Sequence, residues 1–352
     1  MAEQENQKLP AGGKKEEKKR GIINVTLVVL LIGSLFFAGY NIFLNYRETR
    51  EEKAKTVKFG LITDVHCYSK LNKDTNEWEI NWRCQRPLEE FVKNMNEEFK
   101  PDFVIENGDF TDGRDKRGEE SFLRANEIYQ KIEAPKYHVL GNHETDNITK
   151  EKWREIVGYD KDYYYFDVKS YRFIVLDANN VAVPEGSDNI VDMSPTTPHS
   201  YKGMMDKEQL AWLENLLKES GNYKKIVFVH EPPLDQTVGK IRGDIFINPK
   251  PLRDLFSEYG VMAVFSGHIE EMCDVNINGV RYFTMQGFHK KSPGLKKEQQ
   301  YKDKGVFHQI TLKDNDIKIE MFFSENRDEP YQSIIFNQET AVCNNSTLPE
   351  QD

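Results

Sequence analysis

The chain has 352 residues, a formal net charge of −10, and 30% charged against 38% hydrophobic residues. This balance excludes an intrinsically disordered chain and a collagen-like protein, and four cysteines are too few for a small fold built on disulfides. The net negative charge argues against a general nucleic-acid-binding protein, because such proteins present a basic face.

The N-terminus combines a polar tail with an apolar stretch. Residues 1–20 are polar and rich in lysine, whereas residues 21–46 contain no charged side chain. Since a helix needs ~20 mainly apolar residues to cross a bilayer, the stretch predicts one transmembrane helix over residues 21–46. A cleaved signal peptide is the alternative, but the stretch is longer than the ~7–15 residues of a signal core and no clear A-x-A site follows it.

The distribution of basic residues predicts an orientation for this helix. Six Lys or Arg residues precede the stretch and five follow it closely. Because cytoplasmic loops carry more Lys and Arg, this small excess favours a cytoplasmic N-terminus. The sequence therefore predicts a single-pass membrane protein whose large C-terminal domain lies outside the cytoplasm.

Strands and helices alternate after a charged linker over residues 47–56. Short apolar runs with β-branched residues predict buried strands, and apolar side chains at helical spacing predict helices. The predicted strands are Val57–Thr63, Asp102–Glu106, His138–Leu140, Tyr164–Val168, Phe173–Leu176, Ile226–Val229, Val261–Phe265, Val275–Ile277 and Arg281–Thr284, and the predicted helices are Pro87–Met95, Glu119–Ile132 and Asp206–Leu217. Asn278-Gly279 predicts a hairpin turn. The pattern predicts one α/β domain over residues 57–325 and a polar tail over residues 326–352.

Polar side chains of a few types follow five of the predicted strands. The segments are Asp64-Val65-His66, Gly108-Asp109-Phe110-Thr111-Asp112, Gly141-Asn142-His143-Glu144, His230-Glu231-Pro232-Pro233 and Gly267-His268-Ile269-Glu270. Ligands of open α/β sheets bind at the carboxyl ends of strands, so we expect these segments to converge. Asp, Asn, Glu and His are ligands of divalent transition metals, and a metal pair needs a shared carboxylate. A single segment of this kind is often only a turn or a helix cap, but five in this order predict a site for two metal ions.

The five segments together resemble the motif set of the calcineurin-like metallophosphoesterase superfamily. That set is D-x-H, G-D-x-x-D, G-N-H-[DE], a histidine that ends a strand, and G-H-x-H. The resemblance covers residues 57–323, and through His230-Glu231-Pro232-Pro233 and residues 209–213 the chain is most similar to class III cyclic-nucleotide phosphodiesterases and purple-acid-phosphatase relatives. It implies a four-layer αββα sandwich with two metals at one edge.

The resemblance also implies a role for each matching residue. His143 would act near the leaving-group oxygen, and Asp112 would orient it. Glu270 stands where the family has its final histidine, and the resulting oxygen-rich first site favours Mn²⁺ or Fe over Zn²⁺. The implied ligands are Asp64, His66, Asp109 and Glu270 for the first metal, and Asp109, Asn142, His230 and His268 for the second.

These inferences predict a membrane-anchored hydrolase that cleaves a phosphate ester with a metal-activated water. Diesters, such as cyclic nucleotides or phospholipid and glycerol diesters, are slightly favoured through the H-x-P-P resemblance. The partner would be a small phosphate ester or a lipid headgroup; a phosphomonoesterase or a phosphoprotein phosphatase is the alternative within the same class. Because Glu270 alters the first site, a non-catalytic membrane-tethered domain is a second hypothesis. A nuclease is a third, which the acidic charge disfavours.

Two further pairs of residues are candidates from their positions. His199 lies in a long loop and His289 follows the last motif, so both are predicted to contact substrate, because binding residues favour loops. Cys67 follows His66, and Cys84 lies at the predicted entry to a helix. The two cysteines could form a disulfide or remain two free thiols, and the sequence leaves both open.

Overall fold

The computed structural model describes residues 29–43, 55–113, 117–198, 200–234, 245–288, 305–324, 330 and 332–336. The chain divides into two compact units, Met1–Ala54 and Lys55–Asp352. In the first unit, residues 29–43 form a helix with exposed apolar side chains. The predicted tail over residues 1–20 and residues 47–54 of the predicted linker lie outside the described residues.

The prediction of a transmembrane helix over residues 21–46 is contradicted. Within the described ranges, no helix is both long and apolar enough to cross a membrane. Residues 29–43, at ~1.5 Å per residue, extend over roughly 22 Å, which is short of the ~30 Å hydrocarbon layer. Residues 21–28 and 44–46 of the predicted span lie outside the described residues. This finding overturns the predicted localisation as a single-pass membrane protein with a cytoplasmic N-terminus.

Two mixed sheets form the centre of the second unit, as far as its residues are described. The first sheet has the order β16-β15-β14-β1-β4-β5, in which β1, β4 and β5 are parallel and the others antiparallel. Its strands are β1 (Thr56–Ile62), β4 (Phe103–Glu106), β5 (Lys136–His138), β14 (Val306–Lys313), β15 (Asp316–Phe323) and β16 (Gln332–Phe336). Strand β16 lies within the predicted C-terminal tail, so the sheet extends beyond the predicted end of the domain.

The second sheet has the order β12-β13-β11-β10-β7-β6, with parallel strands in its middle and an antiparallel strand at each edge. Its strands are β6 (Tyr164–Val168), β7 (Tyr171–Val175), β10 (Lys224–Phe228), β11 (Val261–Ser266), β12 (Cys273–Ile277) and β13 (Val280–Thr284). Asn278 and Gly279 have φ angles of 52° and 87°, which the hairpin between β12 and β13 requires. The predicted hairpin is confirmed.

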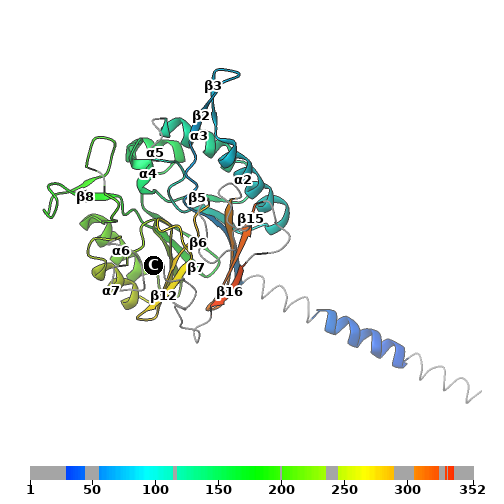
Figure 1. Cartoon of the computed structure of the whole chain (residues 1–352). Helices are drawn as coiled ribbons and strands as arrows, with labels where there is room; N and C mark the ends of the chain where they lie inside the picture. Colours follow the sequence, from blue (N-terminus) through cyan, green and yellow to red (C-terminus); the bar gives the residue numbers. More distant parts are fainter. Residues whose placement is uncertain are drawn as a thin grey trace, which may run out of the picture. The chain divides into compact units, whose positions relative to one another are not determined.

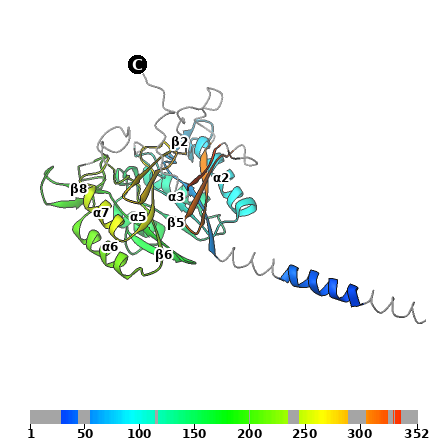
Figure 2. The same ribbon diagram turned by 90° about the horizontal axis from the view of Figure 1, so that it is seen from below.

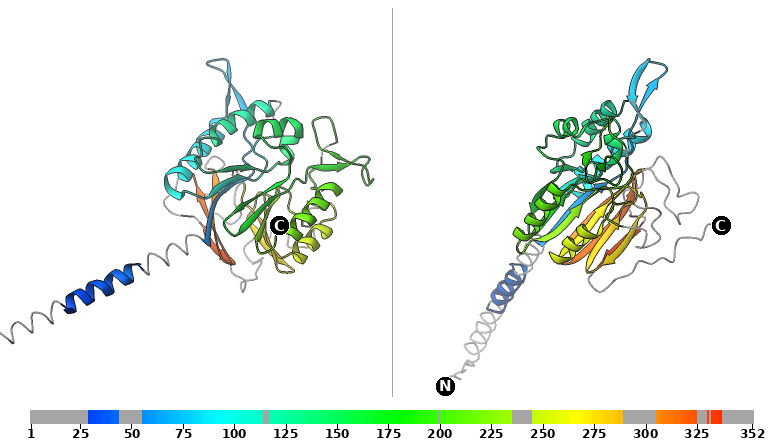
Figure 3. Two further views of the ribbon diagram at one scale, coloured as in Figure 1. Left: turned by 180° about the vertical axis from the view of Figure 1, so that it is seen from behind. Right: turned by 90° about the vertical axis from the view of Figure 1, so that its left-hand side faces the viewer.

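Helices cover the outer face of each sheet. They are α2 (Trp82–Lys93), the π-helix η1 (Asn94–Phe99), α3 (Gly118–Tyr129), α4 (Asn142–Thr145) and α5 (Lys150–Val157) on the side of the first sheet, and α6 (Lys207–Glu219) and α7 (Lys250–Glu258) on the side of the second (Figures 1 and 2). Two small hairpins, β2 (Ser69–Asn72) with β3 (Glu77–Ile80) and β8 (Asn180–Ala182) with β9 (Ile190–Asp192), extend from this body (Figure 3).

Apolar clusters between the layers hold the described elements together. One cluster joins Phe91 and Phe122 on the helices to the first sheet, and another joins Leu213 and Phe256 to the second. Between the two sheets, Phe59 of β1 packs against the rings of Phe173 and Phe228, with centroids 5.9 and 5.7 Å away. Burying a large side chain contributes about 1.5–3 kcal/mol, so these faces fix the sheets against each other. The order is helices, sheet, sheet, helices, which is the four-layer order that the family resemblance implied.

Candidate metal centre

The carboxyl ends of five strands bring the predicted ligands to one edge. Strand β1 pairs in parallel with β4, and β10 with β11. Backbone hydrogen bonds continue this pairing beyond the strand ends: the Asp64 N–H donates to the Gly108 carbonyl at 2.9 Å, and the Gly267 N–H donates to the His230 carbonyl at 3.0 Å. Asp109, after β4, lies against His230, after β10. The sheets therefore meet at the site.

Five predicted ligands have a left-handed backbone, which residues other than glycine rarely adopt. The φ angles are 54° at Asp64, 47° at His66, 55° at Asp109, 67° at His268 and 58° at Glu270. Such conformations cost on the order of 1–3 kcal/mol each, and they concentrate at functional sites where the surrounding structure holds them. Here they end the strands abruptly and direct the chain along the sheet edge.

One glycine is required at this edge. Gly108 has a φ of 91°, and a Cβ atom there would lie 2.6 Å from Cγ and 2.8 Å from Cβ of His230. Because any side chain would overlap the imidazole, only glycine lets the chain before Asp109 approach His230 this closely.

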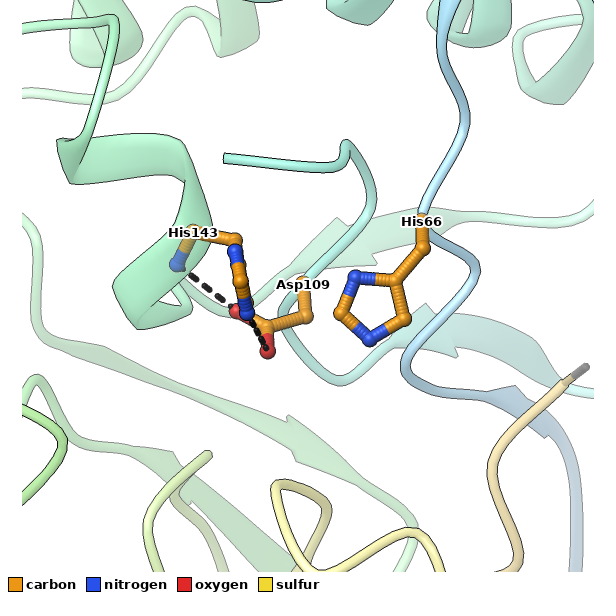
Figure 4. A group of neighbouring side chains, drawn as sticks. All are labelled: His66, Asp109 and His143. Atoms are coloured by element: carbon orange, nitrogen blue, oxygen red, sulfur yellow. Dashed lines mark hydrogen bonds and ion pairs between the residues drawn. The ribbon is translucent and has the colours of Figure 1, made fainter. Parts of the chain in front are cut away.

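Three groups of side chains among the described residues each place their ligand atoms within 4.8 Å of one another. The groups are Asp64, His66 and Glu270; Asp109, His230 and His268; and His66, Asp109 and His143. Figure 4 shows the third group, in which the rings of His66 and His143 lie on either side of the Asp109 carboxylate. Asp109 belongs to two groups, as a carboxylate shared by two cations must.

The hydrogen bonding of His230 fits a metal ligand. Its Nδ1 lies 2.8 Å from the carbonyl of Asn107, which can only accept, so Nδ1 carries the proton. The other nitrogen, Nε2, is buried and makes no hydrogen bond to any described residue, although it lies 3.0 Å from Oδ2 of Asp109. A lone pair that faces a carboxylate is stabilised by a cation, and metal-ligating histidines commonly donate their second N–H to a carbonyl.

The buried carboxylates also require positive charge. Asp64 and Asp109 are 1% and 2% exposed. The pKa of Asp64 is raised to about 7, chiefly by burial and in addition by the neighbouring Asp109 and Glu270, while His230 and His66 act in the opposite direction. Because buried charges are paired with an opposite charge or coordinate a metal, divalent cations would offset this repulsion.

The remaining predicted ligands lie beside these groups. Glu270 Oε1 is 3.6 Å from His66 Nε2, and Asp64 Oδ1 is 4.0 Å from the same nitrogen. His268 Nδ1 is 3.0 Å from Oδ1 of Asn142, and the His268 N–H donates to the Asp64 carboxylate at 3.1 Å. All seven predicted ligand side chains therefore have at least one such contact with another member of the set.

Glu144 supports the centre, although the sequence suggested no role for it beyond its place in the G-N-H-E segment. Its side chain is 1% exposed and accepts backbone N–H groups from Asp109 at 3.1 Å, Thr111 at 2.9 Å and Gly141 at 2.9 Å. One carboxylate thus binds the segment after β4 to the segment after β5. The sequence signal that could have identified Glu144 is its place as the acidic residue of the G-N-H-E segment. The backbone groups that it binds are decided by the tertiary structure.

His143 lies at the edge of the centre. Its backbone N–H donates to Asp109 Oδ1 at 2.9 Å, and its ring Nε2 is 3.9 Å from Asp109 Oδ2. Its Nδ1 accepts the Gly113 N–H at 3.0 Å and lies 3.5 Å from Oδ2 of Asp146. The orienting role of Asp112 stays a prediction; its backbone N–H donates to the Cys67 carbonyl at 2.9 Å.

Two other predictions concern residues around the site. His199 and His289, the predicted substrate contacts, lie outside the described residues. Of the two states that the sequence left open for Cys67 and Cys84, the structure has the disulfide, with the Cα atoms 5.5 Å apart. Both cysteines are buried, so the bridge fixes the segment after His66 against the start of α2.

Comparison with known proteins agrees with this arrangement. The sequence model of calcineurin-like phosphoesterases matches residues 57–271. A probable glycerophosphodiester phosphodiesterase from Arcobacter nitrofigilis is 24% identical over 214 residues, which are 60% of this chain and 71% of the relative. A manganese-dependent ADP-ribose/CDP-alcohol diphosphatase from Oryza sativa subsp. japonica is 23% identical over 241 residues, 59% of this chain and 75% of the relative. A dimetal phosphatase from Danio rerio has a similar fold, with a TM-score of 0.61 at 17% identity over 80% of this chain and 99% of that one.

Proposed function

Because the chain belongs to the calcineurin-like phosphoesterase family, and is thus a metal-dependent hydrolase of phosphoric ester bonds, we propose that it hydrolyses small phosphodiesters or diphosphates. The observation that carries the proposal is the position of Asp109, which contributes to two of the ligand groups and lies against His230 and His143. A shared carboxylate with a histidine beside it is the arrangement that hydrolysis at a metal pair needs.

We assign the metal ligands by group. The cluster of Asp64, His66 and Glu270, with Asp109, would hold the first ion, and the cluster of Asp109, His230 and His268, with Asn142, would hold the second. Glu270 supplies a carboxylate 3.6 Å from His66 where the family has a histidine, so the site gains an oxygen ligand instead of losing one. Oxygen ligands favour Mn²⁺ or Fe over Zn²⁺, and the manganese dependence in the name of one relative agrees.

When bound, two divalent cations lower the pKa of a water toward neutrality and neutralise charge on the phosphate oxygens. The chain's own groups do the rest. Asp109 and Asn142 would hold the two cations in place, and His143 Nε2 lies 3.9 Å from Asp109 Oδ2, beside the position that the ester would occupy. In the proposed reaction, a hydroxide oxygen forms a bond to phosphorus while the bond between phosphorus and the leaving-group oxygen breaks. The leaving-group oxygen then takes the proton from Nε2 of His143. Solvent then returns a proton to the ring.

The activities named for the two relatives support a substrate in which phosphorus is esterified on two sides. One acts on a glycerophosphodiester, and the other on ADP-ribose and CDP-alcohols. A glycerophosphodiester headgroup is therefore our first candidate, and the resemblance of His230-Glu231-Pro232-Pro233 to the motif of phosphodiesterases agrees with it. A phosphomonoesterase is the second candidate.

The test compares substrate classes on the full chain. The protein is loaded with Mn²⁺ and assayed with bis-(p-nitrophenyl) phosphate and p-nitrophenyl phosphate, then with a glycerophosphodiester and ADP-ribose, while metal content is measured on the same sample. We expect kcat/KM for the diester to exceed that for the monoester. A preference for the monoester would support a phosphomonoesterase. No turnover with Mn²⁺, Fe²⁺ or Zn²⁺, despite bound metal, would support a non-catalytic domain.

A further inference from the structure

The turn between β4 and Asp109 contacts ligands of both proposed metal ions. Its two residues are Asn107 and Gly108. The carbonyl of Gly108 accepts the backbone N–H of Asp64 at 2.9 Å, and the carbonyl of Asn107 lies 2.8 Å from Nδ1 of His230. Asp109, the ligand shared by both groups, follows the turn directly. The position of this turn therefore affects ligands that come from both sheets.

One side chain holds the turn from inside the protein. Glu106, the last residue of β4, is 1% exposed, and its Oε1 accepts the N–H of Gly108 at 2.7 Å. The φ angle of Gly108 is 91°, so this bond fixes the chain at the point where it turns sharply. On the basis of the proposed function, we propose that Glu106 is a positioning residue of the metal centre, which acts through Gly108 and not as a ligand.

A second buried side chain holds Glu106 in turn. Its other oxygen, Oε2, lies 3.1 Å from Nδ1 of His138, which is 2% exposed. The His138 N–H donates to the hydroxyl of Tyr159 at 3.2 Å, and the His138 carbonyl accepts the hydroxyl of Tyr164 at 2.7 Å. The ring of His138 packs against that of Tyr129, with the centroids 4.8 Å apart. Glu106 therefore belongs to a buried network at the end of β5.

The hydrogen bond to Glu106 is important because Gly108 is a glycine. Its backbone can adopt many angles, and a Cβ atom that would restrict them would overlap the ring of His230. Without an acceptor at position 106, the buried N–H would lose its partner and the turn would relax toward another one. Asp109 and the two carbonyls would move with it. Since outer partners that orient metal ligands commonly change metal affinity, this movement should weaken metal binding.

The experiment measures Mn²⁺ affinity and stability in the full chain. Glu106→Met fills similar space with an unbranched side chain but removes the acceptor for Gly108, whereas Glu106→Gln keeps a carbonyl oxygen there. Free Mn²⁺ is followed by EPR during a titration, and urea unfolding without metal gives the stability. We expect Glu106→Met to weaken Mn²⁺ binding roughly 10–100-fold, and Glu106→Gln to bind Mn²⁺ nearly as tightly as the parent.

Two further variants complete the set. Leu213→Ala is the matched control for stability, because Leu213 is buried in the cluster over the second sheet; it should lower the stability and leave the Mn²⁺ affinity unchanged. His138→Phe covers the case in which Glu106→Met does not fold. It removes the contact with Oε2 while Glu106 keeps its bond to Gly108, so Mn²⁺ binding should weaken, but less than in Glu106→Met.

The outcomes separate this inference from the proposed function. A parent protein that binds Mn²⁺ but hydrolyses no ester rejects the proposed function, and the affinities of the variants still decide the inference. Parent affinity in Glu106→Met, an equal loss in Glu106→Gln, or an equal loss in Leu213→Ala would overturn the inference. If Glu106→Met does not fold, parent affinity in His138→Phe overturns it. A parent protein that binds no Mn²⁺ overturns both.

Discussion

Nε2 of His230 lies 3.0 Å from Oδ2 of Asp109, and the two residues come from different sheets. Both side chains are almost completely buried, and Nδ1 of His230 is committed to the carbonyl of Asn107. The pair therefore presents a nitrogen lone pair and a carboxylate to the same point, which is favourable when a cation binds there. In the proposed metal centre, Asp109 is therefore the ligand shared by both groups.

Loss of the Asp109 carboxylate should remove metal, whereas loss of the neighbouring His143 side chain should not. We expect Asp109→Asn to lower bound metal to well below that of the parent, because the residue contributes to two ligand groups. His143→Ala should keep the metal and lower kcat by about 10²–10⁴-fold, since it removes a proton donor. Metal analysis and kcat on the same preparations check both. Equal metal loss in the two variants would contradict this division of roles.

Glu270 should set the metal preference. The Glu270 carboxylate lies 3.6 Å from His66 Nε2 and is the proposed oxygen ligand. Glu270→His restores the family residue and offers a nitrogen ligand instead, so the ratio of activity with Zn²⁺ to activity with Mn²⁺ should increase. Glu270→Ala should lower metal occupancy instead. Titration of each ion against activity measures both effects. An unchanged metal preference in Glu270→His would mean that Glu270 is not a ligand.

Glu144 should be important for stability as well as activity. Its buried carboxylate accepts three backbone N–H groups that surround the site, and Glu144→Gln replaces part of this acceptor with a donor. We expect the free energy of unfolding to fall by roughly 2–4 kcal/mol, because buried N–H groups lose charged partners. Chemical denaturation measures the change. Glu133→Gln, at an exposed position, is the matched control and should unfold like the parent.

His308 should make the stability of the fold depend on pH. Burial lowers the pKa of His308 to about 4, and its side chain is fully buried beside the Leu61 carbonyl. Between pH 6.5 and pH 4 the unfolded chain therefore binds a proton that the folded chain does not, so stability falls as the pH is lowered through this window. From pH 7 to pH 5 the contribution of this residue is about 2 kcal/mol.

The variant His308→Gln isolates this contribution. Urea unfolding at pH 7 and at pH 5 should show a larger drop in the free energy of unfolding for the parent than for the variant. Other groups titrate equally in both proteins, so their contributions cancel when the drop for the variant is subtracted from the drop for the parent. The same drop in both proteins would show that His308 is not protonated on unfolding in this range.

The order of strands and helices could be read from the sequence because its signals are local. Apolar runs such as Val57–Thr63 and the spacing of Asp206–Leu217 depend on near neighbours, and both are found as β1 and α6. The apolar stretch over residues 21–46 misled the prediction, since among the described residues only 29–43 form a helix and that helix is too short to cross a membrane. Strand β16 was missed because its partner, β15, supplies the pairing and its own sequence is polar at the flanks.

By itself, the sequence determined the residue types that follow each strand, and hence the family and the need for divalent metals. Only the tertiary structure decided which of these side chains meet. It joined Asp109 to His230 across two sheets, placed Asp146 at His143 and closed the disulfide between Cys67 and Cys84. The reason is that the end of a strand can be predicted from local sequence, and it determines where the chain leaves the sheet. Contacts between side chains depend instead on the left-handed turns after the strands and on packing between distant segments.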